Sequence, residues 1–289
     1  MKKAKLKLNI IILTVLTFVV LFFVLKDDFY GVTDVLLNSN KILIILVLLV
    51  IILSELFKAL SLWTIIKDVK KDYTLFRAFS FVIKTEFFNG ITPFALGGQP
   101  FQLYSLKNNE DIDYATGINI IYKDYYSYQF AFLTLITLFL LVNYIFKIVP
   151  LTGVLKEALL VGYIIIFSIT TFLFCILHKK REKSKIIEFF VKVLSKIKIV
   201  KNKEELLNRI DGYIKGVRNQ LRNNKNFTKC YFLNMLKLLT LGLAGYLCLK
   251  ATFISNVNVL IAIIIVLFAM TVSGFIPIPG GSVGIEYTF

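Results

Sequence analysis

A short phrase rich in glycine and proline occurs twice in apolar surroundings, and it constrains the fold more than any other feature. It spans residues 89–100 and 273–281, and each copy reads as a small polar residue, Gly, two residues, Pro and then Gly-Gly. Proline removes a backbone donor and paired glycines destabilise a helix, so neither copy is an uninterrupted helix. Lipid does not tolerate the peptide groups that such breaks leave unpaired. The two breaks therefore predict a polar cavity or a protein interior at membrane depth.

The rest of the chain predicts an all-α polytopic membrane protein. Of its 289 residues, 57% are hydrophobic, and the mean hydropathy of +0.75 is too high for a soluble domain of this length. A bilayer core requires about 20 apolar residues per helix. About six transmembrane helices are expected from the apolar runs 8–25, 42–66, 126–146, 159–177, 231–249 and 257–276. No small-x-small cleavage site follows the first run, which is therefore expected to be an uncleaved helix.

The distribution of charge predicts the orientation of the chain. The net charge is +16, and residues 178–229 carry 16 Lys/Arg against five Asp/Glu. The positive-inside rule places this loop in the cytoplasm, together with the basic segments 1–7 and 67–77. The expected location is the cell membrane, with a cytoplasmic N-terminus. Residues 186–199 have one apolar stripe, which favours a helix on the membrane surface; the loop is either a topological anchor or a collector of anionic inner-leaflet lipids.

This topology gives the two phrases a geometry. Basic residues flank 76–106 on both sides, so this segment should enter and leave on the cytoplasmic side as a re-entrant hairpin with 93–100 as its tip. The second phrase follows 257–276, which should run inward from the outside. The two tips then approach from opposite faces, as in an inverted repeat with a binding site between its halves.

At these residues the chain resembles the lysylphosphatidylglycerol synthase transmembrane region family, flippase-like membrane domains found alone or fused to an aminoacyl-phospholipid synthase. The resemblance rests on Gly-Gly-Gln-Pro-Phe-Gln-Leu-Tyr at 97–104 and Pro-Gly-Gly-Ser-Val-Gly-Ile-Glu at 279–286. It implies a single flippase-like domain over 1–289. Family members continue past the second motif, so we expect this chain to lack one or more C-terminal helices. No synthase domain is expected in this chain, and neither is its lipid-modifying reaction.

Broken helices supply polar partners for a lipid headgroup crossing the membrane. The turns at Gly97-Gly98 and Gly280-Gly281 are expected to offer free N–H groups to a phosphate, with Gly284 allowing close approach. In the hairpin, Lys84 is expected to meet phosphate and Glu86 an amine; alternatively the two neutralise each other, or Lys84 snorkels. Further candidates flank the breaks or lie in the polar cluster 122–129: Asn89, Pro93, Gln99, Pro100, Lys123, Asp124, Pro277, Pro279 and Glu286.

Two other charged pairs have competing interpretations. Glu55 and Lys58 lie three residues apart on one face of the second span and either pair with each other or contact substrate. Asp111 and Asp113 have the only Asp-x-Asp spacing, and they are either helix caps or metal ligands; caps are favoured, and neither a metal nor another cofactor is expected.

The leading hypothesis is a flippase that moves an anionic or aminoacylated phospholipid, such as lysylphosphatidylglycerol, or a related lipid-linked compound between leaflets. The alternatives are a membrane-embedded transferase acting on lipid-linked substrates and a membrane scaffold whose basic loop recruits partners. The expected partners are the phospholipid and, through 178–229, anionic inner-leaflet lipids. Nucleic acid is not expected, and a homo-oligomer is compatible with this interpretation.

Overall fold

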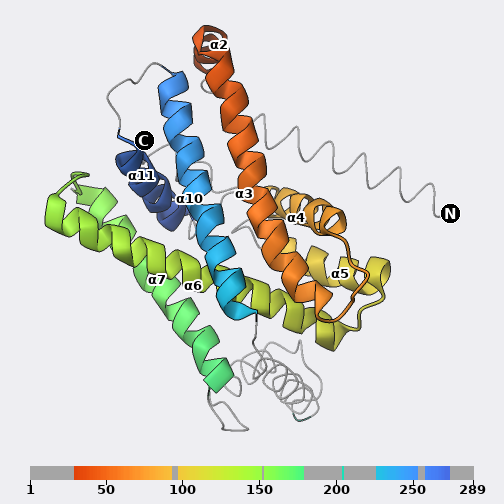
Figure 1. Ribbon diagram of the computed structural model, residues 1–289. Coiled ribbons are helices and arrows are strands. Elements are labelled where there is room, and N and C mark those ends of the chain that lie inside the picture. The colour runs from red at the N-terminus through yellow and green to blue at the C-terminus, as the bar shows by residue number, and fades with distance from the viewer. Residues whose placement is uncertain are drawn as a thin grey trace.

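The computed structural model is an assembly of helices of unequal length (Figure 1). It describes residues 29–92, 97–151, 153–178, 204, 226–252 and 258–273, which contain helices and no strand. The helices are α2 (Phe29–Asn38), α3 (Lys41–Lys67), α4 (Leu75–Gly90), α5 (Gly98–Glu110), α6 (Tyr114–Phe146), α7 (Gly153–His178), α10 (Phe227–Ala251) and α11 (Val259–Ser273). The predicted run 8–25, most of the basic loop 178–229 and the second phrase from residue 274 lie outside the described residues.

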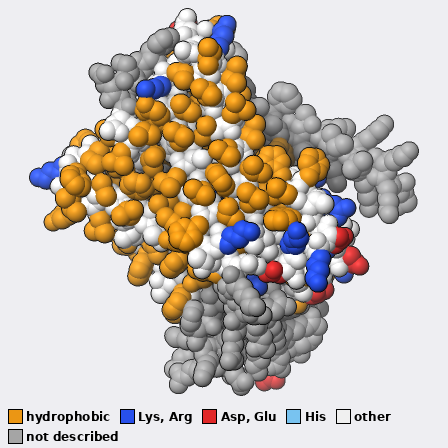
Figure 2. Space-filling view, in the orientation of Figure 1, with side chains coloured by type: hydrophobic (Ala, Val, Ile, Leu, Met, Phe, Trp, Pro, Cys, Tyr) orange, Lys and Arg blue, Asp and Glu red, His pale blue; other side chains and the backbone are white. Residues whose placement is uncertain are grey.

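Among the described residues, four helices are long and apolar enough to cross a membrane: α3, α6, α10 and, within α7, Leu155–Cys175. They confirm four of the predicted spans, and α11 covers the described part of the expected span at 257–276, whose residues 257 and 274–276 lie outside the described residues. Figure 2 shows a broad hydrophobic surface over α3, α10 and α6, with charged side chains gathered beside it at one end. On α3 the exposed residues include Ile42, Ile45, Leu48 and Ile52. This surface fits contact with lipid tails.

α3 and α10 form the central antiparallel pair (Figure 1). At one end, the Asn40 N–H donates to the Ala251 carbonyl at 3.2 Å. At the other, the Asn226 amide donates to the Asp68 carboxylate at 2.8 Å. The basic segment 67–77 and the start of α10 thus lie at the same end of the bundle, as the charge pattern predicts. Which side of a membrane this end faces remains a prediction.

α4 and α5 form the predicted helical hairpin. With 16 and 13 residues, they span about 24 and 20 Å, which is less than the bilayer core of about 30 Å. Glu110 at the end of α5 pairs with Lys70, just before α4, at 2.8 Å. The chain therefore enters and leaves the hairpin at one end of the bundle, as a re-entrant segment requires.

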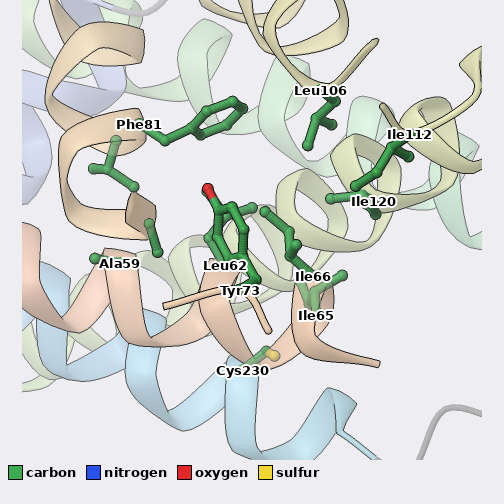
Figure 3. Packing of buried hydrophobic residues seen from close by; sticks show 12 residues of the cluster. Ala59, Leu62, Ile65, Ile66, Tyr73, Phe81, Leu106, Ile112, Ile120 and Cys230 are labelled. Atoms are coloured by element: carbon green, nitrogen blue, oxygen red, sulfur yellow. The ribbon is translucent and has the colours of Figure 1, made fainter. Parts of the chain in front are cut away.

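A buried apolar cluster holds the base of the hairpin against the bundle. Figure 3 shows Phe81 of α4 and Leu106 of α5 facing Leu62 and Ile66 of α3, with Ile120 of α6 beside them. Leu62, Ile66 and Leu106 are at most 1% exposed. Fully burying a side chain of this size contributes about 1.5–3 kcal/mol. Hydrophobic packing therefore fixes where the hairpin stands, independently of its polar residues.

The break between the hairpin arms is shorter than the predicted tip. Helix α5 resumes at Gly98, so Pro100 lies in its first turn and not in the turn itself. Proline is tolerated there because the first N–H groups of a helix have no intrahelical partner. At the tip, stacking of Phe88 on Phe101, with centroids 4.5 Å apart, joins the arms. Residues 93–96 lie outside the described part of the chain.

α6 follows the hairpin and is the longest of the described helices, with 33 residues or about 50 Å. Asp113 caps its N-terminus, accepting hydrogen bonds from the backbone N–H groups of Ala115 and Thr116 at 3.0 and 3.1 Å. Hydrogen bonds from Thr116 and Ala115 hold the pKa of this carboxyl below its usual value. Asp111 ends α5 in the left-handed conformation, with φ of 54°. The capping interpretation of this Asp-x-Asp pair is confirmed.

Close approach of the arms at Gly98 gives a test of the hairpin. A Cβ at Gly98 would lie 2.2 Å from Asn89 Oδ1 and 2.8 Å from Thr85 Cγ2, whereas a Cβ at Gly90 would meet nothing within 4 Å. We expect Gly98→Ala to lower the free energy of unfolding by about 1–3 kcal/mol through overpacking. Gly90→Ala should be neutral or slightly stabilising. Thermal unfolding of the two variants in detergent checks this, and equal stabilities would contradict the packing described.

Candidate functional site

A cavity of about 490 Å³ lies where seven helices meet. Its charged and amide residues come from α3, the two hairpin arms, α6 and α10, and its apolar residues come mainly from α7. Ligand pockets commonly measure about 300–1,000 Å³. The charged and amide side chains on its wall are Glu55, Lys58, Glu86, Asn89, Gln99, Gln102, Asp124, Gln129 and Lys237.

The first of two ion-pair clusters joins α3 to α6. Lys58 Nζ lies 2.8 Å from both carboxylate oxygens of Asp124. The two side chains are only 10% and 5% exposed. Isolated charges at this depth would be costly, and a close, two-oxygen contact compensates for much of the lost hydration.

The second cluster joins three helices through one ammonium group. Lys237 Nζ of α10 lies 3.5 Å from Glu55 Oε1 of α3 and 3.4 Å from Glu86 Oε1 of α4. Glu86 Oε2 also accepts a hydrogen bond from the Asn89 amide at 3.2 Å. Lys237 thus ties the hairpin to the α3–α10 pair inside the cavity.

Aromatic and amide groups connect the two clusters. The Tyr128 ring lies between both ammonium groups, 5.2 Å from Lys58 Nζ and 5.5 Å from Lys237 Nζ, within cation–π range. The Asn234 amide of α10 donates to Ser61 Oγ of α3 at 3.1 Å and to Ser127 Oγ of α6 at 3.0 Å. These contacts hold α3, α6 and α10 in register around the site.

The side of the cavity that α7 forms is apolar. Ile165, Ile166 and Ile169 of α7 line it, with Phe132 of α6 and Met270 of α11. Ile165 is 37% exposed, so this wall reaches the surface of the bundle. One end of the cavity can therefore solvate charge while the other accepts hydrocarbon.

The structure brings some of the predicted site residues together. Glu86, Asn89, Gln99 and Asp124 line the cavity. Lys84, Pro100 and Lys123 do not line it: Lys84 is exposed on the other face of α4, and Lys123 is half-buried on α6. Pro93 lies outside the described residues. So do all the candidates from the second phrase and the motif that follows it: Pro277, Pro279, Gly280, Gly281, Gly284 and Glu286.

Two of the pairings considered from the sequence are wrong. Lys84 and Glu86 do not neutralise each other, because residues two apart on a helix point in different directions; Glu86 pairs with Lys237 instead. Glu55 and Lys58 share a face of α3, but each reaches a different helix, Glu55 to α10 and Lys58 to α6.

The glycine N–H groups differ from expectation as well. The Gly97 N–H donates to Thr92 Oγ1 at 2.8 Å, and the Gly98 N–H donates to Asn89 Oδ1 at 2.9 Å. Side chains of the preceding arm therefore already occupy the donors that were expected to be free for a phosphate. The glycines serve the close approach of the two arms.

Sequence reasoning missed the residue at the centre of the site, Lys237. Its signal was present, because a lysine in the middle of the apolar run 231–249 is costly in lipid and marks a function by default. Tyr128 and Asn234 were missed as well. Asn234 is fully buried in that same run.

The helices and the cavity define a multi-pass α-helical membrane protein with an amphipathic, charge-lined internal site. Residues 9–289 match the model of one protein family, described as the Lysylphosphatidylglycerol synthase TM region. The chain belongs to that family, as the two motifs indicate. Comparison with curated proteins and with solved structures finds no match.

The Lys58–Asp124 pair gives a second test. Lys58→Met leaves a buried carboxylate unpaired, and breaking a buried pair in this way costs about 3–5 kcal/mol. Replacing both residues, in Lys58→Met/Asp124→Leu, should restore much of that loss. Thermal unfolding in detergent measures the stability of the single and double variants. Lys84→Met is the matched control at an exposed lysine. A Lys58→Met variant as stable as the control would contradict the pairing.

Proposed function

We propose that this protein is a flippase, which moves an anionic or aminoacylated phospholipid or a related lipid-linked compound between leaflets. The observation that carries the proposal is the two-sided cavity. Its charged wall offers both ammonium and carboxylate groups, and its α7 wall offers isoleucines that reach the surface. A phospholipid has the same division between headgroup and chains.

The charged wall supplies substitutes for water. A phosphate entering the cavity meets Lys58 and Lys237, and an amine meets Glu55, Glu86 or Asp124. Each of these side chains already has an opposite charge beside it. A headgroup therefore exchanges places with an existing partner, which avoids the cost of leaving any charge unpaired at membrane depth.

The hairpin provides a movable part. Helices that end within the membrane and are held by a few polar contacts are typical of transport sites. Here the base of the hairpin is fixed by apolar packing, and its upper half is tied to α10 by Lys237 and Glu86. A substrate that competes for Lys237 weakens that tie, which links binding to opening. We further propose that the N-terminus is cytoplasmic, because the positive-inside rule favours that side for the basic segments 1–7 and 67–77.

Flipping is measured with the protein reconstituted in phosphatidylglycerol-containing vesicles, each carrying one labelled lipid: phosphatidylglycerol, lysylphosphatidylglycerol or phosphatidylethanolamine. Loss of fluorescence to a membrane-impermeant quencher reports the fraction of labelled lipid in the outer leaflet. The protein should accelerate exchange of at least one of these lipids over empty vesicles. No acceleration with any of them would overturn the proposal, and headgroup modification without exchange would favour a transferase.

A cavity-filling variant tests the route. Ile169→Trp puts a larger side chain on the apolar wall and so narrows the cavity. A misfit of even one methylene in an apolar pocket costs about ten- to 200-fold in rate. We expect flipping to fall by at least about tenfold. The control is Ile164→Trp, the same change at an exposed α7 residue that does not line the cavity. Equal rates in the two variants would exclude this cavity as the path.

A further inference from the structure

We propose that Glu55 is a proton-binding site, and that its protonation decides whether Lys237 holds the hairpin to α10. The inference rests on the proposed lipid transport and adds its coupling ion. It starts from a charge imbalance, because the described residues of the cavity wall include two lysines, Lys58 and Lys237, against three carboxylates, Glu55, Glu86 and Asp124.

Within the described part of the chain, one carboxylate in the cavity therefore lacks a cation of its own. Asp124 has Lys58 at 2.8 Å from both of its oxygens. Glu55 and Glu86 share Lys237 at 3.5 and 3.4 Å. Two carboxylates that share one cation in a water-poor site do not both stay ionised easily.

The surroundings assign the proton to Glu55. Glu86 is 40% exposed and has a hydrogen bond from Asn89 at its second oxygen. Glu55 is 14% exposed, and its Oε2 is buried without a hydrogen-bond partner among the described residues. A buried, unpartnered carboxylate oxygen is costly, and a proton on it removes the charge.

The titratable groups that line the cavity with Glu55 come from the helices packed against α3. They are Lys237 of α10, Glu86 of α4, Asp124, Tyr125 and Tyr128 of α6, and Lys58 of α3 itself. Lys58 is already engaged by Asp124, so Lys237 is the cation that responds to Glu55.

The switch follows from these contacts. When Glu55 takes a proton from solvent in the cavity, one O–H bond forms, and Lys237 pairs with Glu86 alone, which ties α4 to α10. When the proton leaves to solvent, ionised Glu55 draws Lys237 toward α3 and the hairpin loses part of its tie. Nearly equal distances from Lys237 to the two carboxylates place the ammonium between these arrangements.

Infrared difference spectroscopy of the purified protein tests the site without any lipid transport. A protonated carboxylic acid gives a C=O stretch that ionised carboxylates lack. We expect such a band near neutral pH, lost in Glu55→Gln and unchanged in Glu157→Gln, an exposed carboxylate on α7. In Glu86→Gln the band should appear only at lower pH, because Lys237 then serves Glu55 alone.

Two spectroscopic outcomes overturn the proposal: no band at any pH at which the protein is folded, or a band that survives in Glu55→Gln. Asn89→Ala separates the two glutamates, since Asn89 is hydrogen-bonded to Glu86. A shift of the band frequency in this variant would place the proton on Glu86 and also overturn the assignment.

Flipping in vesicles with an imposed pH gradient tests the coupling. The wild-type rate should differ between the two gradient directions, and this difference should be lost in Glu55→Gln but kept in Glu157→Gln. Flipping that ignores the gradient in the wild type overturns the coupling alone. A band that behaves as expected in a protein that flips no lipid supports the proton site while the proposed function fails.

Discussion

Charge neutralisation inside an apolar bundle is the constraint on which the rest of this structure depends. Hydrocarbon solvates neither ammonium nor carboxylate, so each ionisable side chain must find its partner on another helix. Lys58 therefore fixes α3 against α6, and Lys237 fixes α10 against both α3 and the hairpin. The contacts that make the site polar therefore add to the apolar packing that holds these helices together.

The hairpin meets a second requirement of the membrane, which is that backbone groups be satisfied within the protein. Its break would leave helix-terminal N–H groups without partners. Thr92 and Asn89 accept hydrogen bonds from Gly97 and Gly98, and these glycines let the arms come close enough. Asn89 also donates a hydrogen bond to Glu86, so the residue that accepts from Gly98 at the break also contacts the ion-pair cluster of Lys237.

Much of the fold could be predicted from the sequence, because apolar length and basic flanks set spans and their direction. The hairpin was predicted from the same two features, since basic residues flank the segment 76–106 on both sides. Pairing could not be predicted in this way: Glu55 and Lys58 are neighbours along one helix face, yet their partners lie 182 and 66 positions away. Which distant helices meet depends on packing such as that of Leu62 and Leu106, which no local pattern encodes.

The length of α6 has a consequence for the site. At about 50 Å it exceeds the bilayer core of about 30 Å, and in Figure 1 it crosses the α3–α10 pair obliquely. A helix longer than its membrane accommodates the mismatch by tilting. Asp124, Tyr128 and Gln129 all project from α6 into the cavity. We therefore expect the cavity to respond to bilayer thickness wherever that thickness changes the tilt of α6, because these side chains would move relative to α3 and α10.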